Sequence, residues 1–558
     1  MRNRIILQTC IGLLFWLSSF LFMEVSIIER LLIFGIAVTV PLTFLLTEIT
    51  DRYGNYFKTY SLAVKVYPIV AISAIMSFFF PLGFISGLWT VPWLIWVAIV
   101  FLYGVQKLMA RGFHYIEEIS IDIGLIYLLL GGVWLSIFRF GINVLDFGTV
   151  IISLTAIHFH FSSFVTPIFA GLLGRLYRQQ RGFLSNPFKL MLIGIMISSF
   201  GIAIGITVSR IVEFIFVGMY AFSLWGYTYY LLFHLYKIVK NKMAYALLSI
   251  SSLTLIMTLF FALMYGFGRM IGIDFVTIPQ MVDYHGLANA FIFVFLGVIG
   301  WLIVQPKMYF LSYGIPFSNI NGKRKIGSDF FQRQEYMSTQ YYSGLVERLD
   351  DFNQTNFNSN IVSPRIRHFY EQTIDYDLQS LTYWQKGFQR LSNVYKLISS
   401  RVEQINLPSH DEEDELTVRS EIIGIDDDRD GRDDVRAWVR TSKSTEKAVF
   451  VAAYSHHSFA NNKYINISLP LPFGHMTGIL RLVNGIDDRL ELTSKARSKN
   501  KGDEGIYYVT KWFSIKLPIS EHFTVWEEED YLKANHEMWI LGKKFLTIDY
   551  SIYSVSTE

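Results

Sequence analysis

The sequence has little charge and almost no cysteine. Only 17% of its 558 residues are Asp, Glu, Lys or Arg, against about 25% in an ordinary soluble domain. Cys10 is the only cysteine, which excludes intramolecular disulfides and multi-cysteine zinc sites. The net charge of +3 gives no sign of a nucleic-acid partner, and none is expected. These features argue against an ordinary soluble enzyme.

Familiar catalytic signatures are missing as well. The chain has no Walker loop, no G-x-G-x-x-G before a predicted helix, no G-x-S-x-G elbow, no H-E-x-x-H and no kinase signature. ATP-driven transport by this chain alone is therefore unsupported, and no cofactor or metal is predicted. A non-enzyme is favoured over an enzyme.

Long hydrophobic runs fill the first 300 residues. Hydrophobic residues make up 52% of the chain and aromatic residues 16%. A helix needs about 20 apolar residues to cross the hydrocarbon core of a bilayer. We expect ten spans, near residues 5–23, 31–48, 66–86, 89–109, 121–138, 148–173, 189–208, 213–235, 244–265 and 286–304. Residues 1–310 are thus predicted to form a polytopic α-helical membrane bundle with the lipid bilayer as its partner.

Basic residues gather in every second gap between these spans. They are Arg2 and Arg4, then Arg52, Lys58 and Lys65, then Lys107 and Arg111, then Arg175, Arg178 and Arg181, and last Lys237, Lys240 and Lys242. Lysine and arginine in short loops are retained on the cytoplasmic side. Both termini are therefore expected to be cytoplasmic.

Beyond residue 310 the chain becomes polar. We predict a linker and helical segment over 311–416, because apolar residues recur there at helical spacing. They are Trp384, Phe388, Leu391, Tyr395, Ile398, Val402 and Ile405. Pro408 is expected to end this helix, and its apolar stripe is expected to pack against a sheet.

After the acidic spacer Asp411 to Glu415 the hydrophobic period changes from 3.6 to 2. Leu546, Ile548 and Tyr550, for example, alternate with polar residues, as in a strand with one buried face. Strands are expected near 417–425, 434–441, 447–455, 463–469, 475–483, 488–493, 505–510, 513–517, 523–527, 533–541 and 546–552. Short strands at close spacing predict a cytoplasmic α+β domain whose residues 417–558 form a mostly antiparallel β barrel or curved sheet.

Several segments resemble one bacterial family. They are Thr155 to Phe161 (TAIHFHF), His285 to Ala290 (HGLANA), His475 to Leu480 (HMTGIL), His536 to Gly542 (HEMWILG) and Phe545 to Tyr550 (FLTIDY). They look like the YndJ-like membrane proteins of Bacillus-type bacteria, over nearly the whole chain. The resemblance implies a multi-pass protein of the bacterial plasma membrane and carries over no catalytic residues.

His158 and His160 are the most unusual residues within the spans, since we place them near the bilayer midplane. Ionisable groups there are costly and usually face partners inside the bundle. Residues two apart on a helix point roughly 200° apart, so each histidine is expected to contact a different neighbouring helix. Functional alternatives are a proton relay, a substrate contact, or haem or copper ligation together with His285. Depth weighs against the last, because His285 opens the predicted tenth span at its outer end.

Two further polar groups complete the candidate site. His285 and Asn289 share a helix face at i and i+4, as a vestibule or as a capped helix start. Asp122 lies with Glu117 and Glu118 at the start of the fifth span, where a helix N-terminus favours negative charge. A capping role is favoured there over ion entry.

The β-rich part offers weaker signals. Asp426, Asp428, Asp430 and Gly431 begin like a calcium loop, but position twelve is Ala437 in place of glutamate. A solvated hairpin tip is the favoured interpretation. His456, His457 and His475 lie among predicted strands, and a three-histidine site is disfavoured because neighbours on a strand face opposite ways.

The leading hypothesis is a membrane protein that transports or binds a small solute or lipid through His158, His160, Asp122, His285 and Asn289. A cytoplasmic β-rich domain would regulate it or recognise a ligand. The alternatives are a membrane-anchored sensor or scaffold, and a histidine-based haem or metal enzyme. The sequence identifies no protein partner.

Overall fold

The computed structural model of the chain describes residues 2–22, 24–113, 115–308, 313–412, 415–459, 461–495 and 502–555. Contacts divide it into two units, Met1–Leu108 with Phe113–Leu311 and Met109–Gly112 with Ser312–Glu558. The domain boundary expected near residue 310 falls at 309–312, outside the described residues, as do residues 413 and 414 of the acidic spacer.

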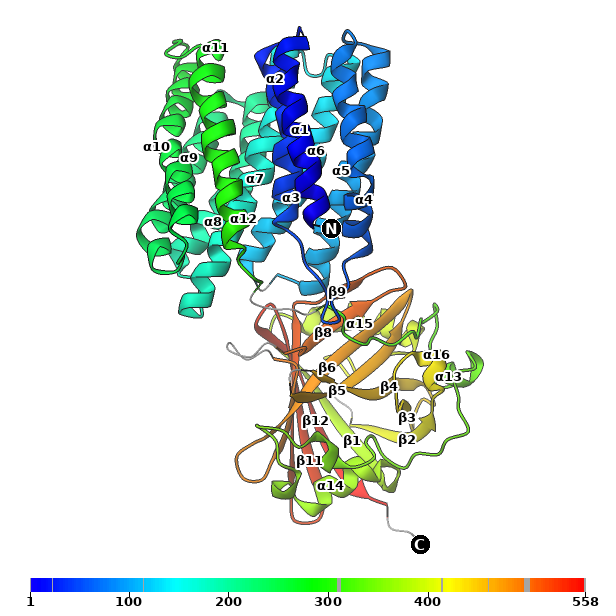
Figure 1. The fold of residues 1–558 in the computed structure, drawn as a ribbon. Helices are drawn as coiled ribbons and strands as arrows, with labels where there is room; N and C mark the ends of the chain where they lie inside the picture. The colour runs from blue at the N-terminus through cyan, green and yellow to red at the C-terminus, as the bar shows by residue number, and fades with distance from the viewer. Residues whose placement is uncertain are drawn as a thin grey trace. The chain divides into compact units, whose positions relative to one another are not determined.

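Ten helical spans make up the described part of the first unit (Figure 1). They are α1 (Arg2–Phe22); α2 (Ile27–Phe34), η1 (Gly35–Thr39) and α3 (Val40–Leu45); α4 (Lys58–Met76) with η2 (Ser77–Phe79); α5 (Phe84–Arg111); α6 (Ile116–Phe140); α7 (Thr149–Arg181); α8 (Asn186–Val208); α9 (Arg210–His234) with η3 (Leu235–Lys237); α10 (Lys242–Ile271); and α11 (Ile278–Gln280), η4 (Met281–Gly286), η5 (Asn289–Leu296) and α12 (Gly297–Val304). The predicted helical bundle is confirmed.

Several spans begin earlier than the hydropathy pattern suggested. The third begins at Lys58 and the tenth at Ile278, each eight residues before its predicted start at 66 or 286. Thr277 explains the latter, because its side chain forms a capping box with Gln280 and so starts the helix in polar sequence. In the third span, long lysine side chains can lie along a helix end with the ammonium in water.

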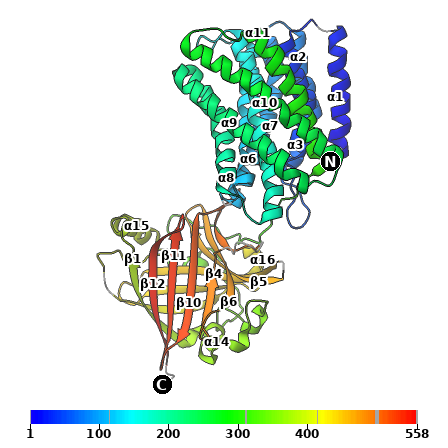
Figure 2. The same cartoon turned by 90° about the vertical axis from the view of Figure 1, so that its left-hand side faces the viewer.

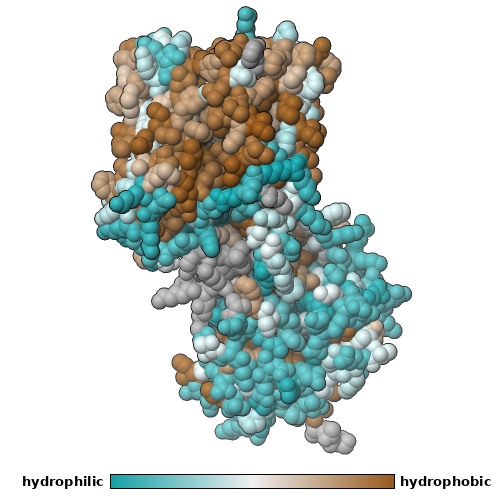
Figure 3. All heavy atoms as spheres, in the orientation of Figure 1, coloured by the Kyte–Doolittle hydropathy of each residue, from teal (hydrophilic) through white to brown (hydrophobic). Residues whose placement is uncertain are grey.

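The face of the first unit that Figure 3 shows is largely hydrophobic. Leu21, Ile69 and Phe84 expose 80%, 73% and 72% of their surface. Such a surface is costly in water and suits contact with lipid. The bundle is organised around α7, which contacts α2, α3, α6, α8, α9 and the tenth span.

The second unit is built on twelve strands in the described residues (Figures 1 and 2). They are β1 (Tyr376–Trp384), β2 (Leu416–Gly424), β3 (Arg436–Ser442), β4 (Ala448–Phe459), β5 (Asn462–Leu471), β6 (Gly474–Asn484), β7 (Leu490–Thr493), β8 (Gly505–Val509), β9 (Ser514–Lys516), β10 (Ile519–Glu527), β11 (Leu532–Ile540) and β12 (Lys543–Ser554). Ten close in the antiparallel order β5-β4-β3-β2-β1-β12-β11-β10-β7-β6, and β6 returns to β5. The predicted barrel is confirmed, with β8 and β9 branching from β6.

Short helices and loops cover part of the barrel. The helices are α13 (Phe330–Arg333), η6 (Leu349–Phe352), η7 (Ser359–Ile361), α14 (Pro364–Glu371), η8 (Thr373–Asp375), α15 (Gln389–Val402) and α16 (Asp427–Asp430). Ile320 and Phe330 pack with Val451 of β4 in one hydrophobic cluster, while Phe450 and Ala452 of the same strand belong to another. Successive strand residues face opposite ways, so β4 is buried on both faces.

The helix predicted to begin at Trp384 begins five residues later, at Gln389. Trp384 instead ends β1, which pairs with β12 along its full length. Gly387, with φ of +96°, separates strand and helix in a conformation that suits glycine. Phe388 and Tyr395 pack against the barrel core, but Leu391 and Ile398 expose 58% and 60% of their surface. Trp384 and Ile405 also belong to that core, and Val402 packs against the cluster of Phe330 and Val451. Five of the seven residues of the predicted apolar stripe are therefore packed.

Candidate functional site

His160 is held inside the helical bundle by neighbours on two helices. It is fully buried, its Nδ1 lies 2.8 Å from the Ala156 carbonyl oxygen, and the indole N–H of Trp93 donates to its Nε2 at 3.2 Å. Gly131 of α6 comes so close that a Cβ there would lie 2.9 Å from Nδ1. Both imidazole nitrogens are thus occupied by protein groups.

His158 faces a different part of the bundle. Its Nδ1 lies 2.8 Å from the Leu154 carbonyl oxygen and its side chain is exposed. His285 of η4 donates from Nδ1 to the Thr258 carbonyl oxygen at 2.7 Å, and the Thr258 hydroxyl donates to Asn289 Oδ1 at 2.9 Å. His285 and Asn289 therefore belong to one polar group on α10, whereas His158 and His160 bond elsewhere.

His285 was expected to open the tenth span, but the span begins before it. Because the tenth span begins at Ile278, His285 lies seven residues into it, and His158 lies nine residues after Thr149. At 1.5 Å per residue both are about 10 to 14 Å from the start of their spans. Even so, no group of three or more His, Cys, Asp or Glu residues that could hold a metal ion occurs in the described chain.

Further polar side chains follow His158 on the same face of α7. Ser162, one turn further on, lies 2.7 Å from the Tyr220 hydroxyl of α9, and Thr166 lies 2.6 Å from the same hydroxyl. Hydroxyl groups can both donate and accept. The face of α7 that carries His158 thus also carries hydroxyl groups that can donate or accept a hydrogen bond, over about two turns.

Asp122 lies in a layer of ion pairs and not in a helix cap. It is fully buried and lies 3.0 Å from Lys107 of α5. Glu118 pairs with Arg175 of α7 at 2.7 Å, and Glu117 pairs with Arg178. The side chain of Tyr115, the N-cap residue of α6, does not cap the helix by a hydrogen bond. Buried charges require a nearby opposite charge, and these acids join α6 to its two neighbours.

The barrel of the second unit encloses a cavity of about 130 Å³. Its wall is mostly apolar, and seven strands contribute alternate residues. They include Trp438 and Arg440; Phe450, Ala452 and Tyr454; Ile465, Ile467 and Leu469; Met476, Gly478 and Leu480; Glu521, Phe523 and Val525; Ala534, His536 and Met538; and Ile548, Tyr550 and Ile552. This alternation places one face of every contributing strand toward the cavity.

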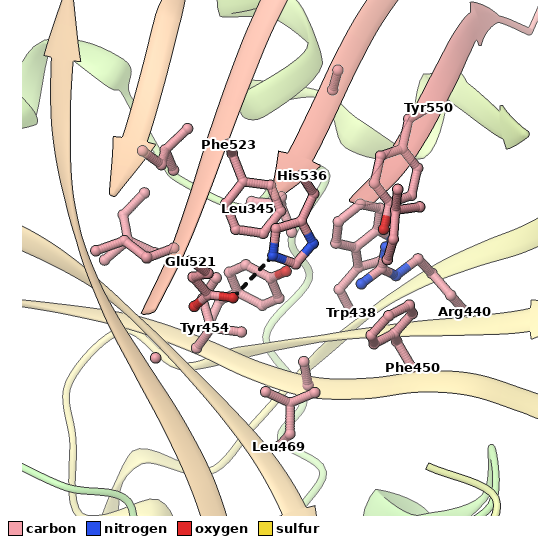
Figure 4. A pocket seen from close by; sticks show the side chains of 18 of the residues that line it. Leu345, Trp438, Arg440, Phe450, Tyr454, Leu469, Glu521, Phe523, His536 and Tyr550 are labelled. Atoms are coloured by element: carbon pink, nitrogen blue, oxygen red, sulfur yellow. Dashed lines mark hydrogen bonds and ion pairs between the residues drawn. The ribbon is translucent and has the colours of Figure 1, made fainter. Parts of the chain in front are cut away.

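A few polar side chains interrupt this apolar wall (Figure 4). His536 Nε2 lies 3.1 Å from Glu521 Oε2, and the His536 ring stacks on Phe523. Tyr454 is buried, which raises the pKa of its hydroxyl to about 12, although the nearby Arg440 charge opposes the rise. An apolar cavity with a few fixed polar groups is the usual form of a small-molecule site.

The remaining candidate residues of the second unit, the calcium-like segment and the strand histidines, make contacts that stabilise the fold. Asp426 caps α16 by accepting from the backbone of Asp428 and Arg429, and Asp430 pairs with Arg432 at 2.6 Å, so the calcium-like segment forms a capped turn. His457 lies 2.8 Å from Asp503. His475 lies 2.8 Å from the Ile320 carbonyl oxygen. The expected separation of these histidines agrees with their different partners.

Sequence reasoning missed Arg440, Glu521 and His536 as cavity residues. The sequence held a signal for two of them. On their predicted strands, Arg440 lies two residues from Trp438 and His536 lies two residues from Ala534, so each lies on the same strand face as an apolar residue. Glu521 preceded the predicted start of its strand at 523. The face on which a residue lies does not by itself show that the sheet closes around a cavity.

Comparison with known proteins agrees with this architecture. The family model of the YndJ-like protein matches residues 30–293. A Bacillus subtilis (strain 168) protein named "Uncharacterized membrane protein YndJ" is 35% identical over 538 residues, which cover 96% of this chain and 95% of the relative. The chain belongs to the YndJ-like family. It is thus a multi-pass membrane protein, and the relatedness to YndJ extends through the barrel. No solved structure matches the chain.

Proposed function

We propose that this YndJ-like protein is a membrane-anchored binding protein for a small, largely apolar molecule, held inside its C-terminal barrel. The observation that supports the proposal is the cavity of about 130 Å³ within the closed barrel. An engineered cavity of about 150 Å³ in another protein holds a benzene ring. Closed barrels of this size range commonly hold one small ligand.

Filling the cavity tests the proposal. Ala534 lines it, whereas Lys533 precedes it on β11 with its side chain 40% exposed. We expect Ala534→Trp to abolish binding of phenylpropanol, an uncharged probe, to the full chain in lipid nanodiscs. The matched control Lys533→Trp should leave binding unchanged. Titration calorimetry with empty nanodiscs subtracted gives the comparison, and equal binding by both variants would contradict the proposal.

A second proposal concerns the helical bundle, where His158, His285 and Asn289 contact a polar solute or a proton. The supporting observation is that His285 and Asn289 both bond to Thr258, His285 at its carbonyl oxygen and Asn289 at its hydroxyl. Ionisable groups in spans are costly and commonly functional. Asp122 and His160 are occupied by Lys107 and Trp93 and take structural roles in this proposal.

Proton flux provides the test for the bundle. In liposomes containing a pH-sensitive dye and a potassium gradient with valinomycin, we expect the full chain to acidify the lumen faster than empty liposomes do. Replacing both His158 and His285 with Phe should remove that excess. His368→Phe, at an exposed histidine of the second unit, is the control. Flux that survives the double replacement would end the role of the two histidines.

For orientation, we propose that the protein lies in the bacterial plasma membrane with both termini and the barrel in the cytoplasm. The support is the alternation of basic residues between spans. A variant with Cys10→Ser provides a background without cysteine. Asn143→Cys should then react with a membrane-impermeant maleimide in intact cells, and Tyr53→Cys should react only after lysis. The reverse pattern would invert the topology.

A further inference from the structure

Arg440 lies in the barrel cavity between two aromatic rings. Its side chain is on β3, on the same face as Trp438, and only 8% of the residue is exposed. The centre of its guanidinium is 4.2 Å from the Trp438 ring and 4.1 Å from the Phe450 ring. In Figure 4 Arg440 is drawn beside these two rings, Glu521 lies away from them, and the His536 ring is drawn between Glu521 and Trp438.

Arg440 differs from Arg432, Arg436 and Arg481, which are also buried in the second unit. Arg432 pairs with Asp430, Arg436 with Asp434 and Arg481 with Glu504. Arg440 has no ion pair with a described carboxylate, its Nε has no hydrogen-bond partner, and its polar neighbour is the Tyr550 hydroxyl. Glu521, the carboxylate that lines the cavity, is hydrogen-bonded to His536.

A buried guanidinium without a counter-ion is unfavourable, and an anion from outside the chain would relieve it. The planar guanidinium matches a carboxylate through two parallel hydrogen bonds. The rest of the cavity wall is apolar apart from the hydroxyls of Tyr454 and Tyr550 and the carboxylate of Glu521 with its partner His536. That carboxylate would repel a second negative charge. The site therefore suits one anionic group joined to an apolar body.

We infer that the barrel binds a monocarboxylate with an apolar body the size of an aromatic ring or a short acyl chain, its carboxylate on Arg440. This inference rests on the proposed binding function of the barrel and defines the chemistry of its ligand. The apolar body contacts the wall formed by strands such as β5 and β6, where Leu469 and Leu480 line the cavity.

The test compares phenylpropionate with phenylpropanol, which differ in the charged group. By titration of the full chain in nanodiscs, we expect the acid to bind about tenfold more tightly than the alcohol. Arg440→Met should reduce that preference to about parity while the alcohol still binds, which shows that the barrel is folded. Arg419→Met, at an exposed arginine on the neighbouring β2, should leave the preference unchanged.

The outcomes separate the two proposals. Equal binding of acid and alcohol by the wild type, or a preference that survives Arg440→Met, would overturn the carboxylate site and leave the binding barrel standing. Failure of both probes to bind the wild type would overturn the binding barrel itself.

Discussion

The indole N–H of Trp93 donates to Nε2 of His160 at 3.2 Å, and the two rings lie nearly parallel. The contact joins α5 to α7 within the bundle, where neither group can bond to water. Removing one partner therefore leaves a buried polar group unsatisfied, which costs about 1–3 kcal/mol.

We predict that His160→Phe destabilises the bundle by about that amount. Unfolding in mixed detergent micelles, followed by far-ultraviolet circular dichroism, measures the change. His158→Phe is the matched control on the same helix, because its Nδ1 contacts only its own helix, and it should alter stability by much less. A larger effect at His158 would contradict the structural role assigned to His160.

The buried pair of Lys107 and Asp122 gives a second prediction. Asp122→Asn removes the negative charge that faces Lys107, and breaking a buried pair in this way costs roughly 3–5 kcal/mol. The double variant Lys107→Met with Asp122→Leu removes both charges and should recover most of that loss. The same unfolding assay compares the three proteins. A single variant as stable as the wild type would show that the pair contributes little.

Acid should weaken the barrel through His475. Burial is the main reason that the pKa of His475 is lowered to about 4 from its usual 6.5, and the Arg432 charge adds to it. Because the unfolded chain binds the proton first, stability is fully present above pH 6.5 and falls as the pH drops toward 4. We predict a loss on the order of 3 kcal/mol over this range.

His475→Gln should flatten the pH dependence between 6.5 and 4, because glutamine does not titrate. Chemical denaturation of the full chain, followed by a near-ultraviolet signal of the barrel, provides the measurement. His368→Gln is the exposed control. An equally steep slope in the His475 variant would assign the acid sensitivity to other groups.

Gly478 gives a prediction for the cavity. A Cβ at this position would lie 2.5 Å from Glu521 Oε1, closer than real contacts allow, so Gly478→Ala must displace Glu521 and disturb its hydrogen bond with His536. We expect phenylpropanol to bind about tenfold more weakly, equivalent to about 1.4 kcal/mol. Gly218→Ala, at a bundle glycine with no atom within 4 Å, is the control. Unchanged binding would mean that the displaced carboxylate leaves the cavity intact.

Much of the barrel was predictable because strand periodicity is local. The alternation of Leu546, Ile548 and Tyr550 is visible in the sequence, and β12 contains all three. β1 was missed because Trp384 continues a helical spacing into α15, and its strand pairs with residues more than 160 positions away. Long-range pairing of this kind overrides a local periodicity.

The candidate sites divide in the same way. The opposite orientation of His158 and His160 follows from helix geometry: His160 bonds to Trp93 of α5, and His158 bonds to a carbonyl oxygen of its own helix. The position of His285 was misjudged because Asp283 and His285 lie in helix that hydropathy assigns to a loop. Arg440 lines a cavity because the sheet closes, and it lacks a carboxylate partner there. Neither property can be read from the sequence of β3 alone.

Lys107, Arg175 and Arg178 were counted as signals of membrane orientation, and the folded bundle uses the same three side chains in ion pairs. During insertion, basic residues direct orientation while acidic residues contribute little. In the finished protein the acidic partners become essential to the contacts between α5, α6 and α7. The same basic side chains therefore serve both membrane orientation and the stability of the folded bundle. Substitutions of Glu117, Glu118 and Asp122 should change the stability without changing the orientation.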